Sequence, residues 1–246
     1  MITNQDKLTV VMAVHNEEKY LPKSLSCLKN EDVSLIVILD QCTDNSEKII
    51  KDIFPEAILI NKIEKKWENS YAENLQLGYE ISNGDYLGIF DADICCQSNS
   101  FIRLRKELVP PVASISAYLI TDKTASFMNN LYYYWEKTFD FGLKEREPRG
   151  AVRVISREAL LKIGGFKDVP TPDTQLDLDL RKAGYESKLS RDVICIHLRV
   201  FSFKKSIETQ IVSGRMRRKM KMPFIQVVGH SIIRLRPFVL YGYLIA

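Results

Sequence analysis

Hydrophobic residues along this chain form short continuous runs that alternate with stretches of helical periodicity. The short runs predict strands buried on both faces, at residues 8–14, 33–39, 57–60, 86–90, 113–119, 151–156 and 193–197. The periodic stretches predict helices at residues 17–29, 46–53, 70–81, 126–141, 157–163 and 174–183. This order predicts an α/β fold with a Rossmann-like, mostly parallel central sheet flanked by helices.

Composition narrows the class of protein. The chain is 46% hydrophobic and 27% charged, which indicates a packed core and excludes disorder. It has five cysteines, an odd number, with no C-x-x-C spacing. We therefore expect neither a disulfide framework nor a zinc site, and we expect a cytoplasmic protein. Residues 1–7 lack the apolar core of a signal peptide.

Two carboxylates follow the predicted strand at residues 86–90. On an extended backbone Asp91 and Asp93 point to the same side, so they can converge on one hard cation at the strand end. Mg²⁺ or Mn²⁺ suits such oxygen ligands and keeps positions open for phosphate oxygens. Further polar residues, His15 to Glu17 and Asp40, follow the first two predicted strands, where ligands bind in folds of this kind.

Three segments around these residues resemble the successive donor-site motifs of family 2 glycosyltransferases. They are V-V-M-A-V-H-N-E-E (Val10 to Glu18), L-D-Q-C-T-D-N-S (Leu39 to Ser46) and N-G-D-Y-L-G-I-F-D-A-D (Asn83 to Asp93). Gly150, G-G-F (Gly164 to Phe166), P-D-T-Q-L (Pro172 to Leu176), R-K-A-G-Y (Arg181 to Tyr185) and His197 follow in the family's order. The resemblance spans about residues 8–200. It implies a GT-A fold and an inverting transfer of a sugar.

The resemblance also implies roles for single residues. Asp40 would accept a hydrogen bond from a uracil or guanine ring N–H, and Asp173 would be the catalytic base. Asp91 would face the ribose or a metal-bound water, and Asp93 would bind the metal. The remaining donor-binding residues would be Ala13, His15, Glu17, Asn74 and Ala92. The chain departs from the family at Ala13, His15, Leu39, Pro172 and Glu73, which stands where a basic residue often precedes Asn74.

Structural interpretations compete with some of these roles. His197 is either a metal ligand or a histidine at the edge of the core. Asp173 is either the base or the N-cap of the next helix, on which Asp177 and Asp179 would be solvated charges. The aromatic stretch 127–141 either shapes an acceptor groove or packs internally. Cys95 and Cys96 are expected to be structural.

We expect a catalytic domain at residues 1–198, with a donor half at about 1–100 and an acceptor half at about 101–198. Residues 199–246 would be a basic, amphipathic helical tail. The tail carries ten Lys or Arg and one acid, Glu208, so about +9 of formal charge lies there and about −5 in the rest. The tail suits an anionic membrane surface. It would otherwise pack on the catalytic domain, or Arg215 or Arg217 would reach the donor diphosphate.

The predicted function is metal-dependent transfer of a sugar, with Mg²⁺ or Mn²⁺, from a nucleotide sugar to an acceptor hydroxyl. A UDP-sugar is the expected donor, and a polyprenyl-linked molecule or a glycan the expected acceptor. The protein would lie in the cytoplasm, peripherally on the membrane, and we expect no nucleic-acid partner. The alternatives are a sugar-nucleotide pyrophosphorylase, whose glycine-rich loop is absent after residue 14, and a non-enzymatic membrane-surface protein. A dehydrogenase is disfavoured because no G-x-G-x-x-G follows the first strand.

Overall fold

The computed structural model describes residues 7–29, 31–137, 148 and 150–246. The described residues form two compact units, residues 7–29, 31–122, 148 and 150–199 in one and residues 123–137 and 200–246 in the other. The second unit therefore takes in residues 123–137, which the sequence placed in the acceptor half. The end of the predicted 126–141 helix, residues 138–141, lies outside the described residues.

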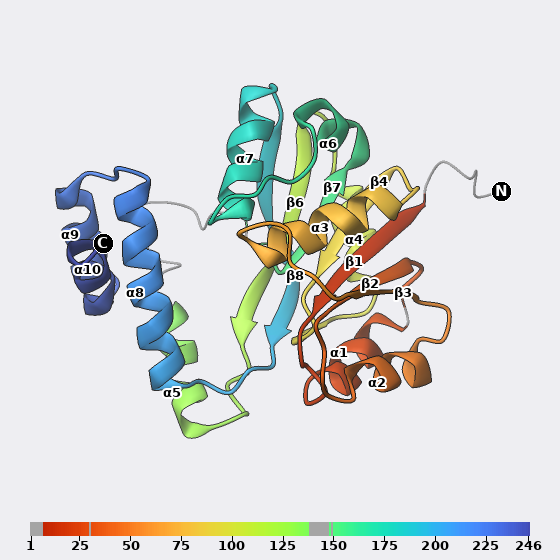
Figure 1. Cartoon of the computed structure of the whole chain (residues 1–246), viewed down its shortest axis with the longest axis horizontal. Helices are drawn as coiled ribbons and strands as arrows, with labels where there is room; N and C mark the ends of the chain where they lie inside the picture. The colour runs from red at the N-terminus through yellow and green to blue at the C-terminus, as the bar shows by residue number, and fades with distance from the viewer. Residues whose placement is uncertain (1–6, 30, 138–147, 149) are drawn as a thin grey trace. The chain divides into compact units, whose positions relative to one another are not determined.

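The first unit is built on one eight-stranded sheet in the order β3-β2-β1-β4-β7-β6-β8-β5. The strands are β1 (Leu8–Val14), β2 (Ser34–Asp40), β3 (Ile58–Lys62), β4 (Tyr86–Phe90), β5 (Ile94–Cys96), β6 (Val112–Thr121), β7 (Val152–Ser156) and β8 (Glu186–His197). Four of the seven pairings are parallel, those of β1 with β2 and β4, β2 with β3, and β6 with β8. The predicted mostly parallel α/β sheet is confirmed (Figure 1).

Helices cover both faces of this sheet. They are α1 (Leu21–Leu28), α2 (Ser46–Ile53), α3 (Ser70–Ile81), α4 (Ser100–Lys106), α6 (Arg157–Ile163) and α7 (Pro172–Lys182). Alternate residues of β1 serve the two faces: Val10 and Met12 pack with α1, α2 and α4, whereas Val11 packs with α3, α6 and α7. The prediction missed β5, α4 and residues 186–192 of β8, and it began the first helix at residue 17, whereas α1 begins at Leu21.

Two disulfides correct the expectation of none. Cys27 of α1 bonds Cys95 of β5, and Cys96 of β5 bonds Cys195 of β8. Cys96 and Cys195 face each other across the antiparallel β5–β8 pair. Cys42 remains a free thiol. The partners lie 68 and 99 residues apart, so no local spacing revealed them. The argument for a reducing cytoplasm therefore loses its support.

The second unit contains α5 (Phe127–Lys137), α8 (Phe203–Lys219), α9 (Phe224–Ile233) and α10 (Pro237–Leu244). Val227, Val239 and Tyr243 form its small core. The backbones of α8 and α10 lie so close together that a Cβ on Gly214 would overlap the carbonyl oxygen of Val239. Among the described residues, no helix is long and apolar enough to cross a bilayer.

Candidate active site

An open cleft of about 480 Å³ lies at the carboxyl ends of β1, β2 and β4. Its lining is Ala13, Val14, His15, Glu17, Asp40, Ser70, Tyr71, Asn74, Asp91, Ala92, Asp93, His197 and Arg199. Every residue predicted to bind the donor or the metal is in this set. The cleft sits where parallel strands end, the position at which α/β sheets bind ligands.

His197 lies beside Asp93 because of the pairing of two strands. The antiparallel register sets His197 opposite Ile94, and the backbone N–H of Leu198 donates to the carbonyl oxygen of Asp93 at 2.8 Å. The Nε2 atom of His197 is then 3.3 Å from Oδ2 of Asp93. At this distance the two side chains could hold one ion between them, and in this structure the same Oδ2 atom forms an ion pair with Arg199.

The described residues contain no cluster of three or more His, Cys, Asp or Glu side chains arranged to hold an ion alone. Mg²⁺ is commonly held by one or two carboxylates, with phosphate and water in its other positions, whereas this pair offers one carboxylate and one imidazole. Arg199 places a cation at the same point, since its guanidinium forms ion pairs with both Asp93 and Glu17. The cleft thus favours positive charge at Asp93.

Asp91 is held in a different environment from Asp93. Its Oδ1 accepts a hydrogen bond from the Tyr71 hydroxyl at 3.1 Å. Burial, with the negative charge of Asp93 next in size, raises the pKa of Asp91 to about 7. Burial and the nearby Asp91 and Asp173 carboxylates raise the pKa of Tyr71, so this phenol stays a hydrogen-bond donor.

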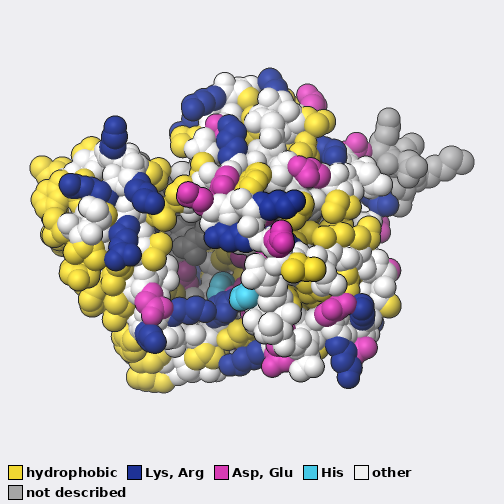
Figure 2. Space-filling view, viewed as in Figure 1, with side chains coloured by type: hydrophobic (Ala, Val, Ile, Leu, Met, Phe, Trp, Pro, Cys, Tyr) yellow, Lys and Arg dark blue, Asp and Glu magenta, His cyan; other side chains and the backbone are white. Residues whose placement is uncertain are grey.

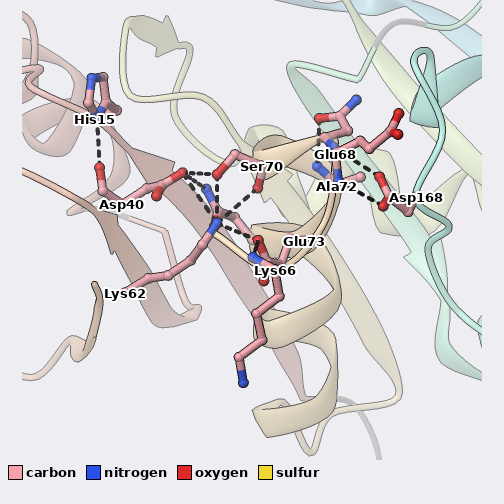
Figure 3. A network of polar contacts seen from close by, with 11 residues as sticks. His15, Asp40, Lys62, Lys66, Glu68, Ser70, Ala72, Glu73 and Asp168 are labelled. Carbon is pink, nitrogen blue, oxygen red and sulfur yellow. Dashed lines mark hydrogen bonds and ion pairs between the residues drawn. The ribbon is translucent and has the colours of Figure 1, made fainter. Parts of the chain in front are cut away.

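Asp40 ends β2 inside a network of polar contacts (Figure 3). Its backbone carbonyl lies 2.7 Å from Nδ1 of His15, so Nδ1 carries the proton and Nε2 of a neutral ring is the acceptor. Its carboxylate accepts hydrogen bonds from Ser70, from Asn74 at 2.9 Å and from Lys62 at 3.4 Å. The network holds three of the predicted donor-binding residues, His15, Asp40 and Asn74.

Asp173 lies in the first turn of α7. Thr171 occupies the N-cap position and Pro172 begins the helix, so the N-cap interpretation of Asp173 is wrong. A Cβ on Gly150 would overlap both Asp173 carboxylate oxygens, which explains a glycine there. Burial raises the pKa of Asp173, against the opposing effects of Arg153 and of a hydrogen bond from the Gly150 backbone. Asp173 does not line the cleft, but its charge acts on Asp91 and Tyr71.

Asp177 and Asp179 are not the solvated charges that the sequence predicted. Arg153 of β7 is fully buried and forms an ion pair with Asp177. Asp179 is 8% exposed and pairs with Lys167 at 2.7 Å. The first pair joins α7 to strand β7, and the second joins α7 to the segment that precedes it. A buried guanidinium such as that of Arg153 requires a partner of this kind. The two ion pairs therefore help to position Asp173.

Four cleft or network residues escaped the sequence prediction: Lys62, Ser70, Tyr71 and Arg199. Some signals were present. Arg199 follows His197 by two positions, and Tyr71 precedes Asn74 by one helical turn. Lys62 ends β3 and is the register partner of Asp40 on β2, which no local pattern shows.

Comparison with known proteins matches residues 9–169 to the family model described as Glycosyl transferase family 2. Among curated proteins, the chain is 26% identical over 211 residues to the glycosyltransferase GlyA of Streptococcus pneumoniae, covering 82% of this chain and 30% of GlyA. It is 31% identical over 121 residues to the glycosyltransferase SunS of Bacillus subtilis, covering 48% of this chain and 26% of SunS. The chain thus spans about a third or less of these relatives.

Solved structures show the same fold. The mannosyltransferase PcManGT of Pyrobaculum calidifontis, in complex with GDP-Man and Mn²⁺, aligns with a TM-score of 0.68 and 19% identity, over 98% of this chain and 71% of that one. Glucosyl-3-phosphoglycerate synthase of Mycobacterium tuberculosis, with Mn²⁺, UDP and glucosyl-3-phosphoglycerate, aligns with a TM-score of 0.59 and 15% identity, over 89% and 81% of the two chains. The fold is GT-A, as predicted, and with the family match over residues 9–169 the chain belongs to glycosyl transferase family 2.

Proposed function

We propose that this chain carries the catalytic domain of a metal-dependent, inverting glycosyltransferase that moves a sugar from a nucleotide sugar to an acceptor hydroxyl. The observation that carries the proposal is the meeting of Asp93, His197 and Asp40 in one cleft, with the partly buried carboxylate of Asp173 near Asp91. Membership of the family and the nucleotide and Mn²⁺ bound in similar structures support it. The proposed donor is a UDP-sugar.

The residues around Asp93 supply positive charge for the leaving group. Asp93 and His197 would hold Mg²⁺ or Mn²⁺, whose charge, when bound, offsets the negative charge that develops on the departing diphosphate. Arg199 lies against Asp93 and Glu17 and brings a second cation to the same place. We propose that Arg199 also contacts the diphosphate. The Tyr71 hydroxyl keeps Asp91 oriented toward the cleft.

Asp173 is proposed to be the general base. In its ionised form it accepts the acceptor hydroxyl proton as that oxygen attacks the anomeric carbon from the face opposite the phosphate. A single displacement of this kind inverts the anomeric centre. The first turn of α7 favours an anionic side chain through the helix dipole, while burial raises the Asp173 pKa and makes the carboxylate more basic.

A donor screen tests this function. Calorimetry with UDP-, GDP- and CDP-sugars, each with and without Mn²⁺, is followed by an assay of nucleoside diphosphate release with candidate lipid-linked and glycan acceptors. The proposal requires Mn²⁺-dependent binding of a nucleotide sugar and release of its nucleoside diphosphate. Release of a sugar 1-phosphate that depends on added pyrophosphate would identify a pyrophosphorylase instead.

We further propose that the second unit docks on an anionic membrane surface near a lipid-linked acceptor. Hydrophobic and basic side chains are both exposed on this unit (Figure 2). Four strongly exposed hydrophobic residues lie on α9 or directly after it: Ile225, Ile232, Ile233 and Leu235. Arg234 and Arg236 stand among them, so an apolar surface suited to lipid tails adjoins cations suited to headgroup phosphates. The cytoplasmic leaflet is the anionic surface we propose.

Three arginines of this unit act on one histidine. Burial, followed by the charges of Arg217, Arg234 and Arg236, lowers the pKa of His230 to about 4. Burial and the charges of Arg236 and Arg234 also lower the pKa of Arg217. Like charges this near one another repel, so a phosphate group placed among them would relieve the repulsion. This cluster supports an anionic headgroup as the partner.

A further inference from the structure

A buried lysine joins two carboxylates at the donor end of the sheet. The Lys62 side chain is 5% exposed, and its Nζ lies 3.4 Å from Oδ2 of Asp40 and 2.9 Å from Oε2 of Glu73. The ammonium also donates to the Ser70 hydroxyl at 2.6 Å and to the Asn74 side-chain oxygen at 2.8 Å. Figure 3 shows these contacts converging on Lys62 from β2 and α3. A lysine buried this deeply needs such partners to stay charged.

The two oxygens of Asp40 are used differently. Oδ2 accepts hydrogen bonds from Ser70, Asn74 and Lys62. Oδ1 accepts none from the described part of the chain, and Asp40 lines the cleft. Burial alone would raise the pKa of Asp40, but the bonds from Ser70 and Asn74 and the charge of Lys62 outweigh it and hold the pKa below its ordinary value. Asp40 is therefore ionised, and Oδ1 can only accept a hydrogen bond.

Glu73 is the second carboxylate that forms an ion pair with Lys62. Its two carboxylate oxygens accept the backbone N–H of Lys66 at 3.0 and 3.2 Å, in addition to the ion pair with Lys62. One buried cation thus stands between two carboxylates, and one negative charge remains unbalanced. The acceptor left without a partner in this group is Oδ1 of Asp40. The buried acid Glu73 is accommodated because Lys62, at the end of β3, provides a positive charge beside it.

We propose that Lys62 is a positioning residue for donor selection: it holds Asp40 with Oδ1 turned to the nucleobase, so that the cleft selects a base with a ring N–H. Uracil and guanine carry that N–H on their pairing edge. Cytosine and adenine present a bare ring nitrogen there, and two facing acceptors repel. This inference rests on the proposed function, since it concerns the base of the same nucleotide sugar.

The test measures dissociation constants of UDP, GDP, CDP and ADP with MnCl₂, at about pH 8 and about pH 5, on either side of the range in which an unsupported carboxyl titrates in a buried site. The variants are Lys62→Met, Lys62→Met/Glu73→Gln and the control Lys66→Met. Lys66 lies four residues after Lys62, in the loop between β3 and α3, and its side chain is exposed. Only its backbone N–H contacts the network around Lys62. Lys62→Met alone leaves the Glu73 carboxylate buried without its cation and could fail to fold for that reason. The double variant removes both charges of this ion pair and takes the place of the single variant in that case.

Wild type is expected to bind UDP or GDP at least about 10-fold more tightly than CDP, by a similar ratio at both pH values, because Asp40 stays ionised. The Lys62 variants should lose about 10-fold in affinity for the preferred nucleotide and little for CDP, with a larger loss at the lower pH. Lys66→Met should match wild type. A general structural role for Lys62 would instead lower the affinity for all four nucleotides equally.

Two results separate this inference from the proposed function. If wild type binds no nucleoside diphosphate, the proposed donor site is wrong, and the inference falls with it. If wild type discriminates between the bases and the Lys62 variants keep that ratio at both pH values, only the inference is overturned. It is also overturned if the wild-type ratio collapses at the lower pH, a measurement that needs no variant.

Discussion

The backbone of Gly150 lies against the carboxylate of Asp173, and a Cβ added at Gly150 would overlap both carboxylate oxygens. The Gly150 backbone also hydrogen-bonds that carboxylate. Gly150→Ala should therefore displace Asp173 and lower turnover by at least about 10-fold while donor affinity is unchanged. Gly229→Ala is the matched control, since a Cβ there meets nothing within 4 Å. Equal turnover in the two variants would show that the position of Asp173 does not matter.

Replacing the proposed base should separate binding from chemistry. Asp173→Asn should bind the donor as wild type does and turn over at least about 10²-fold more slowly, the low end for a positioned base. Calorimetry and product release measure the two quantities. Loss of both binding and turnover would indicate a structural role, and turnover near the wild-type rate would assign the base to another residue.

The pH profile carries a second signature of Asp173. The base works only when ionised, and burial raises its pKa above the ordinary 3.8. Turnover should consequently fall as the pH is lowered through the raised pKa, with a midpoint above 3.8. In Asp173→Asn this acidic limb should disappear from the residual rate. A wild-type rate that stays flat down to the ordinary value would contradict a raised pKa.

Asp93→Ala should abolish Mn²⁺-dependent donor binding while the protein remains folded. Asp93 lies beside His197, and the variant leaves Arg199 its ion pair with Glu17. Calorimetry with a UDP-sugar, with and without Mn²⁺, measures the effect, and thermal melting checks the fold. Asp52→Ala, an exposed aspartate of α2, is the control. If Asp93→Ala keeps the wild-type, metal-dependent affinity for the donor, Asp93 is not a metal ligand.

Thiol labelling tests the two disulfides. Protein prepared in oxidising conditions and denatured without reductant should label at a single thiol, Cys42, and at all five cysteines after reduction. Cys42→Ser should leave no thiol to label before reduction. Because Cys27–Cys95 and Cys96–Cys195 close long loops, reducing each should cost about 2–4 kcal/mol of stability, visible as a lower melting temperature. Five labelled thiols without reductant would show that the pairs do not form.

Membrane docking predicts binding to anionic vesicles that weakens as salt is added, since each nearby Lys or Arg contributes about 1 kcal/mol. Ile232→Ser/Ile233→Ser should reduce co-sedimentation with such vesicles. Ile63→Ser is the control, because Ile63 is equally exposed, at 82% against 81% for Ile233, but lies in the sheet unit. Equal recovery in the supernatant with and without anionic lipid would rule out this docking.

Local pattern was enough to predict much of the fold. The apolar runs at β1 and β4 and the periodic stretches at α2, α3 and α6 match the structure to the residue. These elements can be predicted locally, because the order of apolar and polar residues within a short stretch shows whether one face or both faces are buried. The strand ends then implied one cleft for His15 to Glu17, Asp40, Asp91 and Asp93, since parallel strands end at the same edge of a sheet, and all of these but Asn16 line the cleft.

The contacts that complete the site depend on which strands become neighbours, and no local pattern states that. Pairing of β5 with β8 sets His197 beside Asp93 and joins Cys96 to Cys195. The pairing of β2 with β3 aligns Lys62 with Asp40. The sequence by itself determined most helices, most strands and most of the cleft residues, but not α4, Ser70, Tyr71 or Arg199. Only the tertiary structure decided their partners, because these contacts join residues 22 to 182 positions apart through the order of strands in the sheet.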